Sequence, residues 1–224
     1  MQRPKVVAFD IIETTFRIEP LGDRLAVLGL PASSYARLYA EALRDAVSLA
    51  CIGRFAPFTE IFAGQLAILL AEAGLSASDE AIREALSVMR ELPPHPDAPD
   101  AYARLAEAGV KVVALSNGAE AATRALLDRA GMTASVEHIL SVDTVRLAKP
   151  RREVYRLALE AAGSGPDDTM LVACHPWDVT GAIAARLRGA YVARGKPYPG
   201  TMAKPEIAAE SLAAVADAIL ALPA

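Results

Sequence analysis

Apolar positions in the chain follow two different rhythms on either side of a proline-rich break. A short β-prone run, Val6–Phe9, ends at Asp10, and apolar residues then recur with helical spacing until about residue 90. This spacing predicts three helices, at residues 33–49, 58–73 and 79–90, with Ser78 as the N-cap of the third. No strand is predicted between residues 15 and 90. The helical pattern ends at Pro93, Pro94 and Pro96, because proline cannot continue a helix.

After this break, segments of helical and strand character alternate. Strands are predicted at 110–115, 138–142, 169–173 and 190–193, and helices at 97–108, 120–130, 151–162, 179–187 and 211–222. Asp97 is the expected N-cap of the first of these helices. Strands separated by helices of this length form right-handed βαβ units and hence a parallel sheet. The sequence therefore predicts an α/β core made of residues 1–14 and 93–224, with an all-helical cap, residues 15–92, inserted after the first strand.

Polar side chains stand where predicted strands end and, for Lys149, in the loop before the helix predicted at 151. These residues are Asp10 and Thr14, then Ser116-Asn117-Gly118, then Lys149, and finally His175 and Asp178. Ligands bind beyond the carboxyl ends of parallel strands, so the pattern predicts a site at this edge of the sheet. Each residue also has a purely structural alternative: Asp10 as a turn residue, Asp178 as the N-cap of a helix beginning at 179, Lys149 as a surface residue. Four separate loops would have to place these groups together by accident, which favours the site.

Composition and charge limit the classes of binding partner and the cellular compartment that we expect. Of the 224 residues 53% are hydrophobic and 22% charged, which is ample for a buried core. The formal net charge of −4, without a basic block, disfavours nucleic acid and anionic membranes as partners. Two cysteines are too few for a disulfide framework, and the first residues lack the apolar stretch of a signal peptide. The most apolar window, residues 61–75, is too short to span a bilayer. We expect a cytoplasmic protein.

Four segments together resemble the ordered motifs of the haloacid dehalogenase (HAD) superfamily. They are Ala8-Phe9-Asp10-Ile11-Ile12-Glu13-Thr14, Leu115-Ser116-Asn117-Gly118, Lys149-Pro150 and Trp177-Asp178-Val179-Thr180-Gly181-Ala182. Within the superfamily the chain most resembles the type II L-2-haloacid dehalogenases, whose small helical cap directly follows the first motif. The resemblance implies the HAD fold, a Rossmann-like parallel-sheet core with an inserted helical cap.

One position separates the branches of this superfamily. Its phosphatases carry an aspartate two residues after the nucleophile, as general acid and magnesium ligand, and here that position is Ile12. Their additional magnesium carboxylate would fall near Ala173 or Cys174, and neither supplies one. A hard divalent ion needs several oxygen ligands, so we expect a site with no metal and no other cofactor.

The resemblance implies a covalent mechanism. Asp10 would attack C2 of a short (S)-2-haloacid, expel halide and form an aspartyl ester, which water would hydrolyse to the 2-hydroxy acid. Lys149 would keep Asp10 ionised, Thr14 and Ser116 would orient it, and Asp178 would orient Lys149 or the hydrolytic water. His175 stands where the family has an asparagine; it is either a water-activating base or a residue that only hydrogen-bonds a loop.

The resemblance also implies a substrate and halide pocket. Its candidate residues are Asn117, Phe58, Tyr155, Tyr39 and Ile11. The family's cap arginine would align near Tyr39, with Arg37 and Arg44 displaced along the helix. The expected partner is a small-molecule 2-haloacid, and a homodimer is one further expectation, because relatives often dimerise through the cap. Two alternatives stay open: a magnesium-dependent HAD phosphatase, and a catalytically weak binding protein with the same fold.

Overall fold

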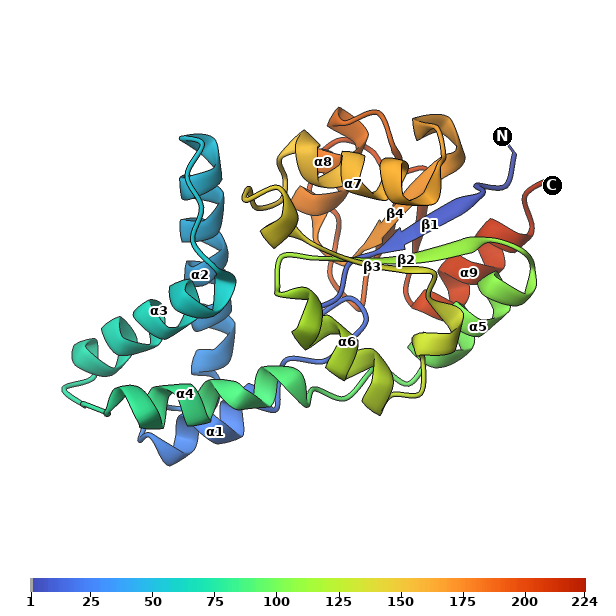
Figure 1. Ribbon diagram of the computed structural model, residues 1–224. Coiled ribbons are helices and arrows are strands. Elements are labelled where there is room, and N and C mark those ends of the chain that lie inside the picture. Colours follow the sequence, from blue (N-terminus) through green and yellow to red (C-terminus); the bar gives the residue numbers. More distant parts are fainter. Residues whose placement is uncertain (1) are drawn as a thin grey trace.

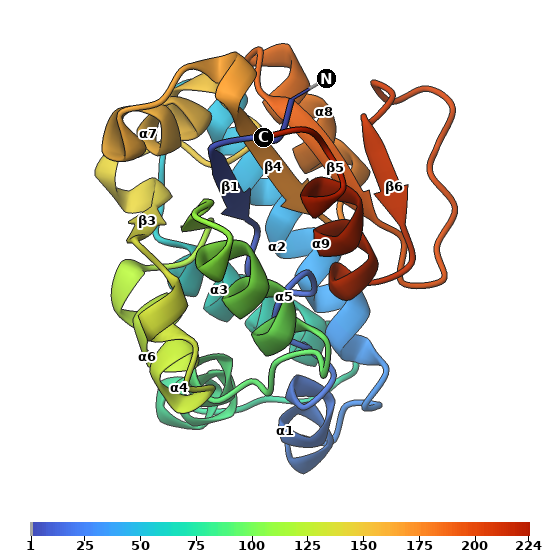
Figure 2. The same cartoon turned by 90° about the vertical axis from the view of Figure 1, so that its right-hand side faces the viewer.

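The core of the computed structural model, which describes residues 2–224, is a parallel β-sheet. The sheet has six strands in the order β3-β2-β1-β4-β5-β6, with β3 and β6 at opposite edges (Figure 2). The strands are β1 (Val6–Phe9), β2 (Lys111–Ser116), β3 (His138–Ser141), β4 (Thr169–Ala173), β5 (Arg188–Val192) and β6 (Ile207–Ala209). The chain therefore runs outward from β1 to β3 and then returns to start again on the other side of β1, so β1 and β4 meet at a topological switch point.

Helices cover both faces of this sheet (Figure 1). One face carries α5 (Ala98–Glu107), α6 (Glu120–Arg129) and α9 (Leu212–Leu220); the other carries α7 (Arg152–Ala162) and α8 (Pro176–Ala184). Short 3₁₀ turns complete the core: η2 (Thr133–Ser135), η3 (Val142–Thr144) and η4 (Pro166–Asp168). This three-layer arrangement confirms the predicted α/β fold class.

Strand β1 shows why the sheet needs helices on both sides. All four of its side chains are buried, and they alternate between two separate apolar clusters. Val7 and Phe9 point to the α5 side, where the Phe9 ring stacks on Tyr102 with centroids 4.2 Å apart. Val6 and Ala8 point to the α7 side. A strand buried on both faces reads as a continuous apolar run in the sequence, which is what residues 6–9 display.

The segment between β1 and α5 is helical and stands apart from the sheet (Figure 1). It contains α1 (Leu21–Val27), α2 (Ser34–Cys51), α3 (Phe58–Glu72), α4 (Asp79–Ser87) and the 3₁₀ turn η1 (Val88–Arg90). As predicted, Ser78 caps α4, accepting a hydrogen bond from Ala81 N. We refer to α1–η1 as the cap. None of the helices described here, in cap or core, has both the length and the apolar character needed to cross a bilayer.

The cap joins the core through two chain crossings that lie side by side. Arg17 N donates to Pro93 O at 2.9 Å, and His95 N donates to Thr15 O at 2.8 Å. Phe16 also forms an antiparallel bridge with Pro94. The outgoing and returning segments thus form a short two-stranded connection between the two parts of the molecule.

Four details differ from the sequence-based expectations. Helix α8 begins at Pro176 rather than at residue 179, because proline is well accommodated in a first helical turn. Asp97 does precede α5 but makes no side-chain cap there; its carboxylate instead accepts from Leu212 N, at the start of α9. Helix α1 and strand β6 were not predicted, since a seven-residue helix and a three-residue edge strand give too little periodicity.

Candidate active site

A cavity of about 80 Å³ lies beyond the carboxyl ends of β1 and β2, between the sheet and the cap. Its walls are formed by Asp10, Ile12, Tyr39, Phe58, Thr59, Phe62, Leu86, Met89, Ser116, Asn117, Gly118, Ala119, Ala122, Thr123, Leu126 and Trp177. Asp10 is the one charged side chain in this set. The cavity therefore has a core wall that carries a carboxylate and a cap wall without charge.

Asp10 is placed by the strand that precedes it. Its backbone N donates to Val172 O on β4 at 3.0 Å, and the residue is only 6% exposed. The Oδ2 atom accepts from Thr14 Oγ1 at 2.6 Å, and Oδ1 accepts from Lys149 Nζ at 3.1 Å. Thr14 Oγ1 in turn accepts from Cys174 N at 3.0 Å, which fixes the hydroxyl so that it donates to the carboxylate.

Lys149 lies behind Asp10 and connects it to Asp178. The Lys149 side chain is completely buried, and its Nζ donates to Asp178 Oδ2 at 2.8 Å. The other oxygen of Asp178 accepts from Tyr155 Oη at 2.6 Å, and the same hydroxyl lies 3.1 Å from Asp178 O. Asp178 is fully buried and paired, so its structural alternative as a helix N-cap is wrong. The sequence-predicted groups Asp10, Lys149 and Asp178 form one continuous chain of charge-assisted hydrogen bonds.

This arrangement sets the protonation of its members. Burial alone would raise the pKa of Asp10, but the charges of Lys149 and His175 and the Thr14 hydrogen bond outweigh it and leave the pKa lowered. Burial would lower the pKa of Lys149, yet the two carboxylates raise it. For Asp178, burial together with the nearby Asp10 charge raises the pKa. Asp10 is thus held as a carboxylate beside a permanent ammonium.

His175 stands at the edge of the site, between Asp10 and Trp177. Its Nε2 lies 3.2 Å from Ile12 O, 3.5 Å from Asp10 Oδ2 and 3.6 Å from Glu13 Oε2. Burial would lower the pKa of His175, but contact with Cys174 and the charges of Asp10 and Glu13 raise it to about 10. The imidazole is therefore protonated at neutral pH, and a protonated ring donates hydrogen bonds but cannot accept a proton from water.

Ser116 and Asn117 form the part of the core wall that follows β2. Ser116 Oγ accepts from Gly118 N at 2.9 Å; in the part of the chain described, Thr14 rather than Ser116 is bonded to the Asp10 carboxylate. Asn117 Oδ1 accepts from Lys149 N at 2.9 Å. Asn117 also lines the cavity, and its amide carries two N–H donors besides this oxygen.

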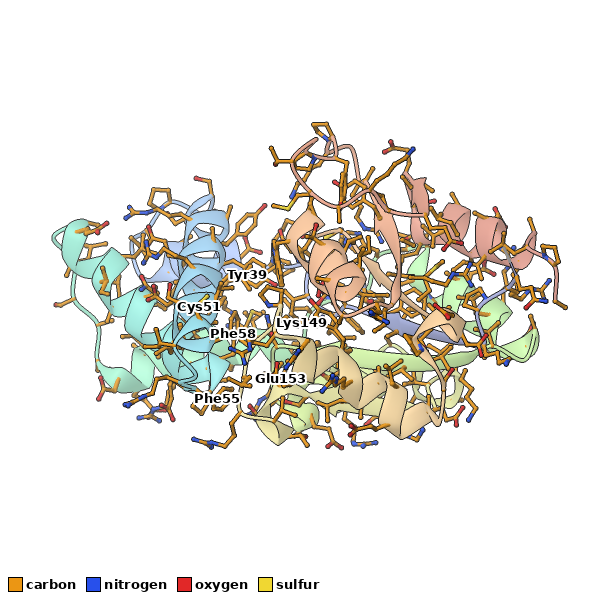
Figure 3. The ribbon with its side chains drawn as sticks, turned by 90° about the horizontal axis from the view of Figure 1, so that it is seen from above. Tyr39, Cys51, Phe55, Phe58, Lys149 and Glu153 are labelled. Carbon is orange, nitrogen blue, oxygen red and sulfur yellow. The ribbon has the colours of Figure 1, made fainter. Side chains whose placement is uncertain are left out.

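The cap wall is aromatic. Tyr39 on α2 and Phe58 on α3 meet edge to face, with centroids 6.2 Å apart, and Figure 3 shows both on the side of the cap nearest Lys149. Burial raises the pKa of Tyr39 well above its ordinary value, helped by the Asp10 charge, so the phenol stays protonated and able to donate. Arg37 and Arg44 do not line the cavity: their exposed side chains pair with Glu41 and Glu72, and with Asp45.

Two of the predicted pocket residues lie elsewhere. Ile11 is fully buried in the core on the α5 side, and its neighbour Ile12 lines the cavity instead. Tyr155 is buried behind Asp178, away from the cavity walls. Sequence reasoning also missed Gly181, where a Cβ atom would lie 2.5 Å from both Pro150 Cβ and Tyr155 Oη. The one signal in the sequence is that position 181 of the last motif is a glycine, which has no Cβ and so lets Pro150 and Tyr155 approach its backbone closely.

The donor set does not fit a magnesium ion. Across residues 2–224, no three His, Cys, Asp or Glu side chains are grouped so that they could hold a metal. The position between Asp10 and Asp178 is taken by the Lys149 ammonium, and Ile12 and Ala173 offer no side-chain oxygen. Magnesium requires about six oxygen ligands, of which this site could provide only a small part.

A family model described as "haloacid dehalogenase-like hydrolase" matches residues 4–186, and the chain belongs to this family. An (S)-2-haloacid dehalogenase of Xanthobacter autotrophicus is 34% identical over 145 residues, which is 65% of this chain and 56% of the relative. Haloacetate dehalogenase H-2 of Moraxella sp. (strain B) is 25% identical over 186 residues, covering 82% and 83% of the two chains. In sequence, the chain thus spans a little over half the length of the first of these relatives.

Similarity in structure extends further. The solved L-2-haloacid dehalogenase from Xanthobacter autotrophicus with chloropropionic acid covalently bound superimposes with a TM-score of 0.90 at 25% identity. The superposition covers 97% of this chain and 99% of that one. The resemblance inferred from the four motifs is thereby confirmed at the level of family and fold.

Proposed function

We propose that this chain is a hydrolase that removes halide from an (S)-2-haloacid through an ester formed on Asp10, without a metal ion or other cofactor. One observation carries the proposal: Asp10 is the single charged group of the cavity wall, and Lys149, Thr14 and His175 hold it as a carboxylate. Supporting it, similar proteins are named as (S)-2-haloacid dehalogenases, and one was solved with chloropropionic acid covalently bound.

The first step is an in-line displacement. A carboxylate oxygen of Asp10 forms a bond to C2, the carbon–halogen bond breaks, and the halide leaves with the bonding electrons. A halide needs no proton to depart, so Ile12, which cannot act as an acid, suits this reaction. The Asn117 amide and the Tyr39 phenol are the donors placed to stabilise the departing anion, as neutral groups in a largely apolar cavity.

The second step hydrolyses the ester. Water adds to the side-chain carbonyl carbon of Asp10, and the bond from that carbon to the ester oxygen bonded to C2 breaks. The product is a 2-hydroxy acid with inverted configuration at C2. One proton is released to solvent, and the new oxygen remains in Asp10. The His175 cation stabilises the developing oxyanion rather than acting as the base, since its pKa of about 10 keeps it protonated.

Binding of the substrate carboxylate also needs a positive electrostatic potential, and the cavity wall contains no positively charged side chain. We place it at the start of α6, where the backbone N–H groups of Asn117 and Ala119 precede the helix and its dipole favours an anion. The free cysteines Cys51 and Cys174 and the net charge of −4 support a small-molecule enzyme of the cytoplasm.

The decisive experiment is a single turnover with excess enzyme in ¹⁸O-labelled water, using (S)-2-chloropropionate and peptide mass analysis. Label is expected in the peptide that contains Asp10 and not in the lactate released. The isosteric variant Asp10→Asn should lose about 10⁴-fold or more in kcat. Label found in the product alone, or halide release by Asp10→Asn at the native rate, would overturn the mechanism.

A parallel assay tests the absence of a metal. Halide release should be unchanged after exhaustive treatment with a chelator, and magnesium should not produce phosphomonoesterase activity. Magnesium-dependent release of phosphate would instead establish the phosphatase alternative.

A further inference from the structure

The loop of residues 10–15 after β1, the nucleophile loop, carries two groups of the proposed reaction, Asp10 at its start and Thr14 four residues later. Between them Glu13 lies in the left-handed region of backbone conformation, with a φ of 64°. A residue with a Cβ atom rarely adopts this conformation, which persists only where the surrounding structure holds it. Contacts from outside the loop therefore determine where the Thr14 hydroxyl lies.

Side chains from three other segments approach the backbone carbonyls of this loop. His175 Nε2 lies 3.2 Å from Ile12 O, His95 Nε2 lies 2.9 Å from Glu13 O, and Arg194 Nη2 donates to Thr14 O at 3.0 Å. Of the three, Arg194 stays charged at every pH of interest, and an ionised donor forms a stronger hydrogen bond than a neutral one. Its carbonyl partner belongs to the residue whose hydroxyl donates to the Asp10 carboxylate.

Arg194 stands two residues beyond the end of β5, at the sheet edge that carries Asp10. Its backbone is also left-handed, with a φ of 45°. The guanidinium donates to Asp97 at 3.2 and 3.4 Å, and the two side chains are 17% and 18% exposed. Burial alone would raise the pKa of Asp97, but the Arg194 charge and the Leu212 N–H outweigh it and leave that pKa lowered. The ion pair thus fixes the direction in which Arg194 presents Nη2 to Thr14 O.

The pair of Arg194 and Asp97 also joins the nucleophile loop to both chain crossings between cap and core. Thr14 precedes the outgoing crossing, which includes Arg17, and Asp97 follows the returning crossing at His95. One guanidinium therefore contacts the chain on each side of the cap insertion.

The Thr14 hydroxyl transmits the position of its backbone to Asp10. Branching at Cβ leaves a threonine side chain few rotamers, so the hydroxyl moves with the backbone. It accepts from Cys174 N at 3.0 Å and donates to Asp10 Oδ2 at 2.6 Å, and these two bonds leave it little freedom. A displacement of Thr14 O would therefore turn the carboxylate away from the direction of in-line attack.

We propose that Arg194 is a positioning residue for the displacement step: through Thr14 it fixes the orientation in which the Asp10 carboxylate attacks C2. This inference rests on the proposed function, because the orientation of Asp10 matters in this way only if Asp10 is the nucleophile. Among residues 2–224, Arg194 is not one of those that line the cavity, so it acts on the rate of reaction and not on substrate binding. Misplacement of a reacting group by about 1 Å can lower a rate roughly 100-fold, which sets the scale of the effect.

The test is the kcat and KM of Arg194→Ala with (S)-2-chloropropionate, together with the rate of ester formation on Asp10 in a rapid-quench single turnover. Both kcat and the rate of ester formation should fall by roughly 10- to 100-fold, with KM unchanged. Asp97→Asn, which weakens the hold on the guanidinium, should lower kcat by a smaller factor. The double variant should be no slower than Arg194→Ala alone, because both changes act through the same contact.

Arg188→Ala is the matched control, since Arg188 lies on the same strand and its guanidinium likewise pairs with one carboxylate, that of Glu206, and one carbonyl, Gln2 O. Its side chain is 14% exposed, close to the 17% of Arg194, but it stands at the opposite end of β5 from the site. Both alanine variants should lose melting temperature, and kcat should fall only for Arg194→Ala. If Arg194→Ala folds poorly, Arg194→Lys and Arg188→Lys replace the two variants. A smaller loss of kcat is then expected for Arg194→Lys alone, because an ammonium cannot reproduce the guanidinium fork.

Equal kcat for the Arg194 and Arg188 variants, or losses that multiply in the double variant, overturn the inference and leave the dehalogenase function standing. Failure of the parent to release chloride overturns both.

Discussion

The two walls of the cavity are built on opposite principles. On the core side, Asp10, Lys149 and Asp178 are buried charges, and hydrogen bonds at 2.6–3.1 Å join them to one another and to Thr14 and Tyr155. On the cap side, Tyr39, Phe58 and Leu86 contribute shape and no charge. The difference teaches that the Asp10 carboxylate is fixed by the sheet and the groups behind it, while the cap supplies the uncharged side of the cavity.

The core wall is also the more sensitive of the two to substitution. A buried ion chain stabilises a fold only while every charge has its partner, because a charge left alone in the interior is costly. The cap wall is held by packing contacts, and the free-energy cost of a substitution there increases with the side-chain volume that is removed. Variants in the core wall should therefore damage stability and catalysis together, whereas variants in the cap wall should change kinetics and selectivity.

The largest effect is expected from Lys149→Met. This change leaves the carboxylates of Asp10 and Asp178 buried without the cation between them, and should lower the free energy of unfolding by about 3–5 kcal/mol. Lys5→Met is the control, because the Lys5 side chain is 74% exposed in its pair with Asp168 and should contribute less than about 1 kcal/mol. Urea denaturation measures both, and equal losses would contradict the contrast between buried and surface pairs.

Gly181→Ala should come next. Its added Cβ would lie 2.5 Å from Pro150 Cβ and Tyr155 Oη, which forces the groups behind Asp178 and Lys149 to move and costs about 1–3 kcal/mol. Gly64→Ala on α3 meets nothing within 4 Å and should be neutral or stabilise its helix. Thermal unfolding separates the two, and kcat should fall only for Gly181→Ala. If the kcat of Gly181→Ala equals that of the parent, the close packing at this glycine is not required for activity.

A smaller effect concerns His175 and pH. Because the folded pKa of about 10 lies above the ordinary value of 6.5, the protonated ring stabilises the fold fully below pH 6.5 and progressively less up to about pH 10. The melting temperature should therefore fall less steeply across this interval in His175→Asn than in the parent. The parent kcat should also fall tenfold per pH unit above about 10, a limb that His175→Asn lacks. Parallel curves for the two proteins would refute the cationic role.

The smallest predicted effect lies in the cap wall. Tyr39→Phe removes one donor to the departing halide and should reduce kcat several-fold, corresponding to about 1 kcal/mol, with little change in melting temperature. Tyr35→Phe, one helical turn earlier on α2 and outside the cavity wall, should leave kcat unaltered. If both variants behave alike, the Tyr39 hydroxyl has no part in the reaction.

Much of the core wall could be read from the sequence, because its residues stand at strand ends. Once the helix–strand alternation implies a parallel sheet, the positions of Asp10, Ser116 and Asp178 at one edge follow from topology alone. The orientation of single side chains did not follow. Ile11 and Ile12 are adjacent and chemically identical, yet only the backbone path after β1 decides that Ile12 reaches the cavity.

The apolar part of the cavity lining could not be predicted at all. Leu86, Met89 and Leu126 have the spacing of ordinary core residues, and their shared role depends on how the cap packs against α6. Tyr155 shows the reverse case, in which a residue expected in the pocket supports it from behind through Asp178. Contacts between elements distant in sequence leave no periodic signal.

The paired crossings that join cap and core have a consequence for protein engineering. Since Arg17 and His95 hydrogen-bond to the opposite crossing, the helical insertion enters and leaves through a single narrow joint. A replacement insertion would need to satisfy this joint and also the contacts that the cap makes with the core elsewhere, such as the packing of η1 against α6 and the hydrogen bond from Arg151 to Ala50 O. The joint therefore marks the place at which a different helical insertion would be joined to the sheet while the strand end that carries Asp10 stays unchanged.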